Sequence, residues 1–160
     1  MAQTGDTDED GLLEEVIVTA TKREESIYDV PIAITAFTAE GIERAGITDL
    51  TDIGKFVPNL NVTGFSAGHT SSVNAFIRGI GLQDHLITTD PGVGVYVDGV
   101  YLGRQVGVNW GLANVERVEV LRGPQGTLFG RDSIGGASHI VTRQPGDEQG
   151  GRVKLYGGTR

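Results

Sequence analysis

Glu116 to Thr142 reads E-R-V-E-V-L-R-G-P-Q-G-T-L-F-G-R-D-S-I-G-G-A-S-H-I-V-T, two strand-like runs on either side of a glycine-rich loop. Val118 and Val120 share one face of the first run at period two, Arg122 closes that run, and Ile140 opens the second. The loop between them holds five glycines and one proline but no lysine or cysteine. Such a composition predicts tight backbone turns between two strands rather than a catalytic loop.

A phosphate-binding function for the same loop is the main enzymatic alternative. The segment from Gly123 to Gly136 lacks the spacing and the lysine of a Walker motif, and it lacks Gly-x-Gly-x-x-Gly before a helix. Ser133 does not lie in a Gly-x-Ser-x-Gly elbow either. We therefore expect no catalytic residue and no enzyme, and a nucleotide titration would test the alternative.

Three motifs precede this loop along the chain. They are E-V-I-V-T-A at Glu15–Ala20, N-A-F-I-R-G at Asn74–Gly79 and V-Y-V-D-G-V at Val95–Val100. Together with the loop, and in the same order, they resemble the plug domain of TonB-dependent outer-membrane receptors. The resemblance covers nearly the whole chain. It implies an α+β plug fold with a small, mixed, four-stranded sheet, short helices and long Gly-rich loops.

Composition is compatible with a turn-rich domain. The 160 residues suffice for about one domain, and 25 are glycine, about twice the usual share of roughly 7%. The absence of cysteine excludes disulfides and thiolate metal sites. Six of the 21 acids lie in residues 1–15, so the remaining chain holds 15 acids against 13 bases. A nearly neutral body argues against a nucleic-acid-binding surface.

Local patterns predict the elements and the caps. Thr38 and Thr48 have the residue type of helix N-caps, and Asp98-Gly99 predicts a two-residue hairpin turn. Helices are expected over 39–45 and 49–57. Strands are expected near 16–21, 30–37, 60–62, 75–78, 93–97, 100–102, 115–121 and 138–142.

The two ends suggest a segment of a larger protein. No signal peptide is visible after Met1, and no run of about 18 apolar residues predicts a membrane-spanning helix. We expect an acidic, disordered N-terminus with a linker over 1–26, a plug over 27–145, and the start of a β-barrel over 146–160, where polar and apolar residues alternate. By resemblance, this soluble chain is a plug separated from its barrel, with its export signal removed.

Two weak metal patterns are present. Asp6, Asp8 and Asp10 have the spacing of the first half of a calcium loop, but the twelfth position is Ile17, which offers no side-chain oxygen. The histidines at 69, 85 and 139 lack helical spacing, and His139 falls in a predicted strand as a structural residue. We expect neither a metal site nor a cofactor.

The resemblance implies two kinds of partner contact. Residues Glu15, Val16, Ile17, Val18, Thr19 and Ala20 resemble the TonB box, which would add as a strand to the periplasmic C-terminal domain of TonB. The alternative is an ordinary N-terminal strand of the domain. Arg78 and Arg122 resemble the arginines that pair with barrel-wall glutamates and hold the plug in the lumen, and the alternative for both is a solvated charge at a strand end.

Three polar, Gly-rich loops, 64–72, 81–92 and 103–111, correspond by resemblance to the plug apices that meet substrate. They offer His69, Gln83, Asp84, His85, Arg104, Gln105, Asn109 and Trp110. The implied function is the gate of an outer-membrane transporter of Gram-negative bacteria, active in energy-coupled uptake of a ferric siderophore or another nutrient. A free-standing periplasmic binding module of the same fold is the alternative, and no residue in the loops selects a substrate.

Overall fold

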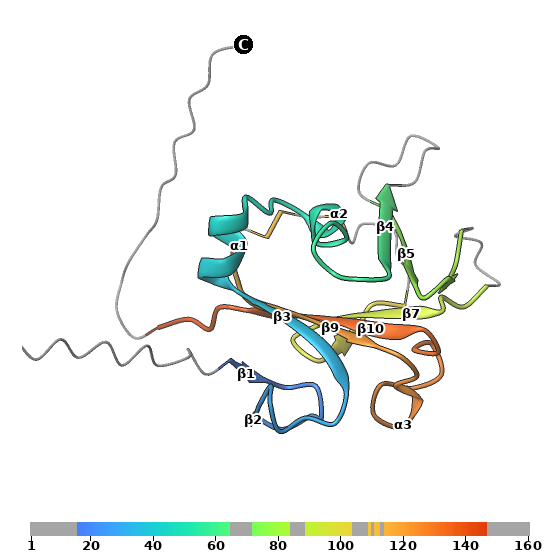
Figure 1. Cartoon of the computed structure of the whole chain (residues 1–160), viewed down its shortest axis with the longest axis horizontal. Helices are drawn as coiled ribbons and strands as arrows, with labels where there is room; N and C mark the ends of the chain where they lie inside the picture. Colours follow the sequence, from blue (N-terminus) through green and yellow to red (C-terminus); the bar gives the residue numbers. More distant parts are fainter. Residues whose placement is uncertain are drawn as a thin grey trace, which may run out of the picture.

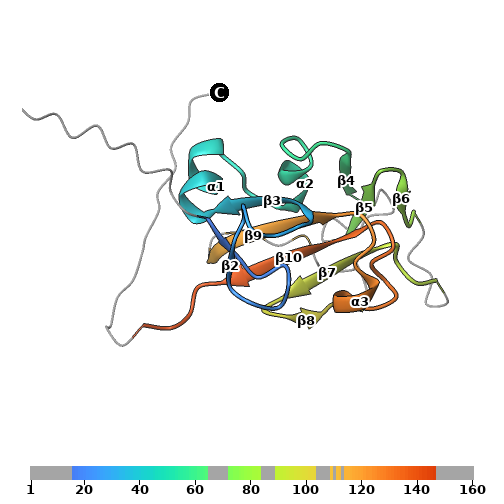
Figure 2. The ribbon, with the colours of Figure 1, turned by 60° about the horizontal axis from the view of Figure 1, so that its bottom comes forward.

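A mixed five-stranded sheet forms the centre of the molecule (Figures 1 and 2). The computed structural model describes residues 16–64, 72–83, 89–103, 109, 111–112 and 114–146. The strand order is β3-β9-β10-β7-β8, and only β10 and β7 run parallel. The bounds are Ala33–Thr38 for β3, Val93–Val97 for β7, Val100–Tyr101 for β8, Val115–Arg122 for β9 and Gly136–Thr142 for β10.

The α+β class is confirmed, and the strand count is corrected from four to five. The fifth strand is β8, which folds back on β7 through the predicted turn. Asp98 and Gly99 both have positive φ, 48° and 82°, as a type I′ hairpin turn requires. This turn brings the two-residue β8 back alongside β7, where it forms the edge strand of the sheet.

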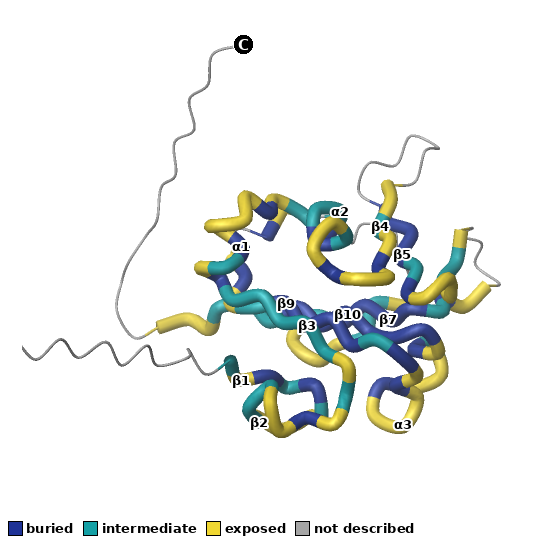
Figure 3. Tube along the Cα trace, viewed as in Figure 1, coloured by how far each residue is buried: buried dark blue, intermediate teal, exposed yellow. Residues whose placement is uncertain are grey.

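The central strands are buried on both faces, as the colouring of Figure 3 shows. Alternate residues of β9 serve two separate hydrophobic clusters. Val118 and Val120 pack in the cluster under the helices, whereas Leu121 packs in the cluster on the opposite face. The sheet is thus the middle layer of the domain.

Two short helices and a three-stranded sheet cover one face (Figure 1). The helices are α1 (Ala39–Ala45) and α2 (Leu50–Ile53), and the strands are β4 (Leu60–Gly64), β5 (Val73–Ile77) and β6 (Ile80–Gly81). None of the helices in the described segments is long and apolar enough to cross a membrane.

The caps confirm one expectation and correct another. The hydroxyl of Thr38 accepts the N–H of Gly41, as expected of an N-cap. The cap of α2 is Asp49, not Thr48, because the Asp49 carboxylate accepts the N–H groups of Thr51 and Asp52. Thr48 instead donates its hydroxyl and its N–H to the Asp52 carboxylate. The helix ends at Ile53 rather than at 57, and the chain continues as turns.

The other face carries the N-terminal segment and α3 (Gly126–Phe129), a four-residue helix inside the predicted loop. The segment begins with β1 (Ile17–Val18) and β2 (Glu25–Ser26), which pair antiparallel. The strand predicted over 16–21 is therefore shorter than expected, because the chain turns at Thr19 to Lys22 with a hydrogen bond of 2.9 Å between their backbone groups.

Candidate functional site

Most of the segment that resembles a TonB box is docked on the central sheet. Ile17 pairs with Ser26 in β2 and remains 40% exposed. Val18 and Ala20 have no exposed surface and pack in the same cluster as Leu121 and Phe129. Glu15 lies outside the described residues. Residues 16–20 are thus packed against the rest of the domain in this structure, and only residues 17–18 of them form a strand.

A buried carboxylate holds the end of this segment. Glu119 of β9 is fully buried, and its Oε1 accepts the backbone N–H of Thr19 at 2.9 Å and the Arg117 Nε at 2.9 Å. The Thr19 hydroxyl donates to the same oxygen at 3.1 Å. Because one charged oxygen accepts three donors, Thr19 is bound more strongly than a neutral acceptor would bind it.

His139 completes this cluster from β10. Its Nδ1 lies 3.7 Å from Glu119 Oε2, and its Nε2 accepts the N–H of Gly99 at 3.1 Å. Burial raises the pKa of Glu119, but hydrogen bonds from His139, Arg117 and the Thr19 N–H outweigh burial and hold the pKa below its ordinary value. Glu119 is therefore ionised at neutral pH.

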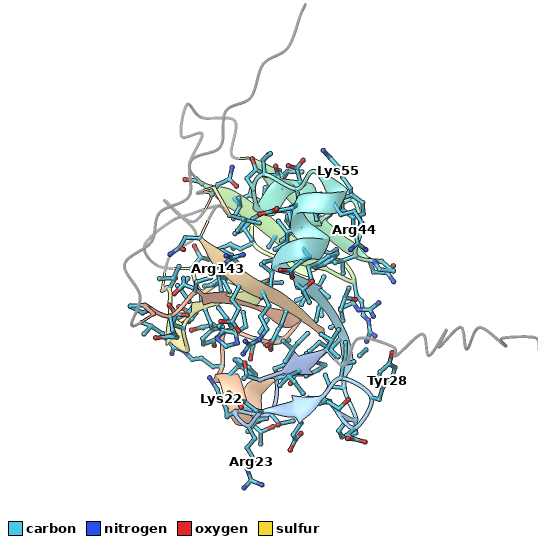
Figure 4. The ribbon with its side chains drawn as sticks, turned by 90° about the vertical axis from the view of Figure 1, so that its left-hand side faces the viewer. Lys22, Arg23, Tyr28, Arg44, Lys55 and Arg143 are labelled. Carbon is cyan, nitrogen blue, oxygen red and sulfur yellow. The ribbon has the colours of Figure 1, made fainter. Side chains whose placement is uncertain are left out.

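Lys22 adds a second attachment after the turn. Its Nζ lies 4.3 Å from the centroid of the Phe129 ring and 5.4 Å from that of Tyr96, within the range of cation–π attraction. Figure 4 shows Lys22 and Arg23 on the side of the sheet opposite Arg44 and Lys55. A groove of about 400 Å³ runs beside this attachment and is lined partly by Thr19, Lys22 and His139.

The domain should lose stability in acid and not in the neutral range. The pKa values of Glu119, Asp98 and Asp52 are all lowered, Asp98 chiefly by the Thr142 N–H and Asp52 chiefly by Lys55. A depressed carboxyl pKa stabilises the fold above the ordinary value, 4.5 for Glu and 3.8 for Asp, and this stabilisation is lost as pH falls toward the folded-state pKa. Urea midpoints should thus agree at pH 7 and 6 and drop below about pH 4.5. Glu119→Gln should reduce that drop, and a midpoint that rises on acidification would contradict the assignment.

The two arginine motifs lie side by side. Arg78 and Gly79, with φ of 53° and 81°, form a two-residue turn between β5 and β6. A Cβ placed on Gly123 would lie 3.6 Å from Arg78 Nη1, so this guanidinium reaches the turn that follows Arg122. Arg78 is exposed, whereas Arg122 is half-buried with its Nε hidden from solvent and without a hydrogen-bond partner. Neither arginine forms a salt bridge within the described residues.

Arg78 adopts a backbone conformation that is unfavourable for a side chain with a Cβ, which costs about 1 kcal/mol. Arg78→Gly should therefore leave the unfolding free energy of this chain unchanged or raise it by up to about 1 kcal/mol. Arg44→Gly, at an exposed position in α1, should instead lower it by about 1 kcal/mol. Urea unfolding compares the two variants. A loss from Arg78→Gly as large as that from Arg44→Gly would mean that Arg78 supports the fold itself.

The substrate-loop residues are only partly placed. Gln83 is exposed and lines a groove of about 570 Å³ beside Arg78, in which the buried Asn74 Oδ1 has no hydrogen-bond partner. Asn109 is half-buried. The described segments hold no group of three or more His, Asp or Glu residues able to bind a metal ion. Outside the described residues lie His69, Asp84, His85, Arg104, Gln105 and Trp110.

Comparison with known proteins places this arrangement in a family. The model of the TonB-dependent Receptor Plug Domain family matches residues 26–137. The chain belongs to this family. The plug domain is 35% identical over 154 residues to the iron-regulated outer membrane virulence protein of Vibrio cholerae, covering 89% of this chain and 22% of that protein. It is 31% identical to the vitamin B12 transporter of Vibrio vulnificus, covering 98% of this chain and 24% of that protein.

A solved structure supports the same fold. The crystal structure of the ferric yersiniabactin uptake receptor from Yersinia pestis matches with a TM-score of 0.59 and 33% identity, covering 71% of this chain and 17% of that one. The plug domain thus spans less than a quarter of the length of these relatives. The family model, together with relatives named as a transporter and an uptake receptor, confirms the family and the expectation that the chain is not an enzyme.

Sequence reasoning missed the cluster around Glu119. One signal was available, an acid at position 119 enclosed by Val118, Val120 and Leu121 in a predicted strand. A carboxylate in such a place must be paired to be tolerated. The pattern does not name the partner, because Thr19 lies 100 residues earlier in the chain.

Proposed function

We propose that this chain is the gate of an outer-membrane transporter, closing a barrel lumen and offering residues 15–20 to TonB for energy-coupled uptake. Membership of the plug family and the similarity to outer-membrane relatives support the proposal. The box faces the periplasm, and the barrel belongs to the part of the protein beyond this chain. The cargo is an iron chelate or another nutrient complex, met by loops 64–72, 81–92 and 103–111.

The observation that carries the proposal is that β1, in the N-terminal segment, is an edge strand. Within the described part of the chain, residues 17–18 form a strand that pairs on one side only, with β2, in a two-stranded sheet. A strand with an unpaired edge is the element that strand addition needs. Among the described residues, Ile17 lies in this strand and is 40% exposed, so a partner strand could reach its side chain.

Arg78 and Arg122 support the placement of the domain inside a barrel. Two arginines at neighbouring turns, without a salt-bridge partner in the described residues, call for an anionic partner, and a barrel-wall glutamate would supply it with bidentate geometry. A free-standing periplasmic module would leave the half-buried Arg122 without such a partner. The gene downstream of codon 160 distinguishes the two, because the module predicts no barrel.

Strand addition is tested by proline in the box. Ile17→Pro removes the backbone N–H of Ile17 and fixes φ, so affinity for a purified TonB periplasmic domain should fall at least about tenfold. Ile17→Thr keeps the donor and the β-branched shape, and its affinity should change little. Val18→Pro is a less clean variant because Val18 is fully buried. Isothermal titration compares them, and equal affinities for Ile17→Pro and Ile17→Thr would reject strand addition.

A further inference from the structure

The two edges of β1 are not equivalent. The carbonyl oxygen of Val16 accepts the N–H of Ile27 at 3.0 Å, so Val16 directs its backbone groups toward the β2 side. In an antiparallel pair this direction alternates from one residue to the next. Val18 therefore also faces β2, whereas Ile17 and Thr19 direct their backbone groups to the outer edge. That outer edge is the one a partner strand would have to use.

On the outer edge, the domain itself already binds both backbone groups of Thr19. The N–H of Thr19 donates to Glu119 Oε1 at 2.9 Å, and its carbonyl oxygen accepts the N–H of Lys22 at 2.9 Å. A partner strand spanning 17–19 needs these same groups for its ladder. The edge is therefore closed at Thr19 as long as the carboxylate of Glu119 stays in place.

We propose that Glu119 is a positioning residue that closes the outer edge of the box strand against a partner. The inference rests on the proposed function of residues 15–20. Arg117 Nε fixes Glu119 Oε1 at 2.9 Å, and His139 Nδ1 lies beside Oε2, so the acceptor is held in place rather than free to swing away. A partner strand gains the full length of the box only when the Thr19 N–H leaves Glu119.

The contact also joins the box to the opposite end of the chain. Glu119 lies on β9, His139 on β10, and Gly99 on the turn between β7 and β8, which donates to His139. The strands β7 and β8 are the ones that follow and precede the loops expected to meet cargo. The carboxylate that closes the edge is thus linked, through His139, to the turn between the two strands that border those loops.

The test compares Glu119→Ala and Glu119→Gln with Glu116→Gln in this 160-residue chain. Glu116 also pairs with Arg117 but is exposed and does not contact Thr19, so it is a matched control. In Glu119→Ala the Thr19 amide should exchange at least about tenfold faster, and the TonB periplasmic domain should bind at least about fivefold more tightly. Glu119→Gln keeps an acceptor oxygen and should lie between Glu119→Ala and wild type. Glu116→Gln should match wild type in both measurements.

The outcomes separate this inference from the proposed function. If Ile17→Pro binds TonB as well as wild type, strand addition fails regardless of Glu119. If Ile17→Pro loses binding but Glu119→Ala gains none while its Thr19 amide exchanges faster, edge closure is wrong and strand addition stands. If Glu119→Ala also accelerates amide exchange at Ile140 in the core, the whole domain has loosened, and Glu119→Gln is then the variant that tests the proposal. The proposal is overturned if, in Glu119→Gln, the exchange rate of the Thr19 amide relative to that of Ile140 equals the wild-type ratio and the affinity for TonB is unchanged.

Discussion

Replacing Gly136 with alanine is expected to lower the unfolding free energy of the domain by at least about 4 kcal/mol, among the largest effects of a single methyl group. Gly136 opens β10 with φ of 151°, and a Cβ there would lie 2.7 Å from Ile77 Cδ1 and would clash with the carbonyl oxygen of Leu121. That oxygen cannot withdraw, because Leu121 is paired with Ala137 on one side and with Ile34 on the other.

Gly126→Ala is the matched control for Gly136→Ala. Gly126 is the first residue of α3, and no atom lies within 4 Å of a Cβ built on it. The same chemical change should there be neutral or stabilising by up to about 1 kcal/mol, because glycine loses more backbone entropy on folding. Urea denaturation followed by circular dichroism measures both. Equal losses in the two variants would show that β10 can shift to admit a methyl group.

Arg122→Ala is expected to act strongly in the intact receptor and weakly in this chain. Under the proposed function, the mutation leaves a barrel carboxylate buried without its partner, which costs about 3–5 kcal/mol. In the isolated domain it removes a guanidinium whose Nε already lacks a partner, so little stability should be lost. Amide exchange in β9 and β10 should accelerate only in the receptor, and conductance across a planar bilayer should rise as the plug loosens.

Arg131→Ala controls for the loss of any arginine. Its side chain is 81% exposed and pairs at 3.2 Å with Asp90, itself 61% exposed, so the pair should contribute little. Exchange and conductance should match wild type in both contexts. If Arg122→Ala slows or accelerates exchange equally in the receptor and in the isolated chain, no barrel carboxylate depends on Arg122.

The parts of the fold that could be predicted are those set by neighbours in the sequence. The alternation of Val118 and Val120 fixes which side of β9 faces the helices, and Asp98-Gly99 carries its own turn geometry. The cap at Thr38 follows from a hydroxyl three residues before the N–H that it accepts. Each of these signals involves residues only a few positions apart, so it can be recognised from the sequence alone.

The parts that could not be predicted depend on distant partners or on strain. Arginine is an unusual residue at positive φ, so the sequence pattern predicts that Arg78 ends a strand and not that it forms a turn. Thr48 and Asp49 both carry a side-chain oxygen that can cap a helix. Asp49 caps α2 because the backbone places its carboxylate, and not the Thr48 hydroxyl, at the first turn. The docking of residues 16–20 depends on Glu119 and His139, which no local pattern connects to Thr19.

The contacts of Thr19 also order the events of folding. Its partners Glu119 and His139 lie 100 and 120 residues further along the chain, so their loops close only after β9 and β10 exist as a paired surface. Residues 16–20 precede both strands in the chain and are therefore among the last of the described residues to settle. Under the proposed function, binding of TonB to residues 15–20 before β9 and β10 have paired would report the folding state of the domain rather than the presence of cargo.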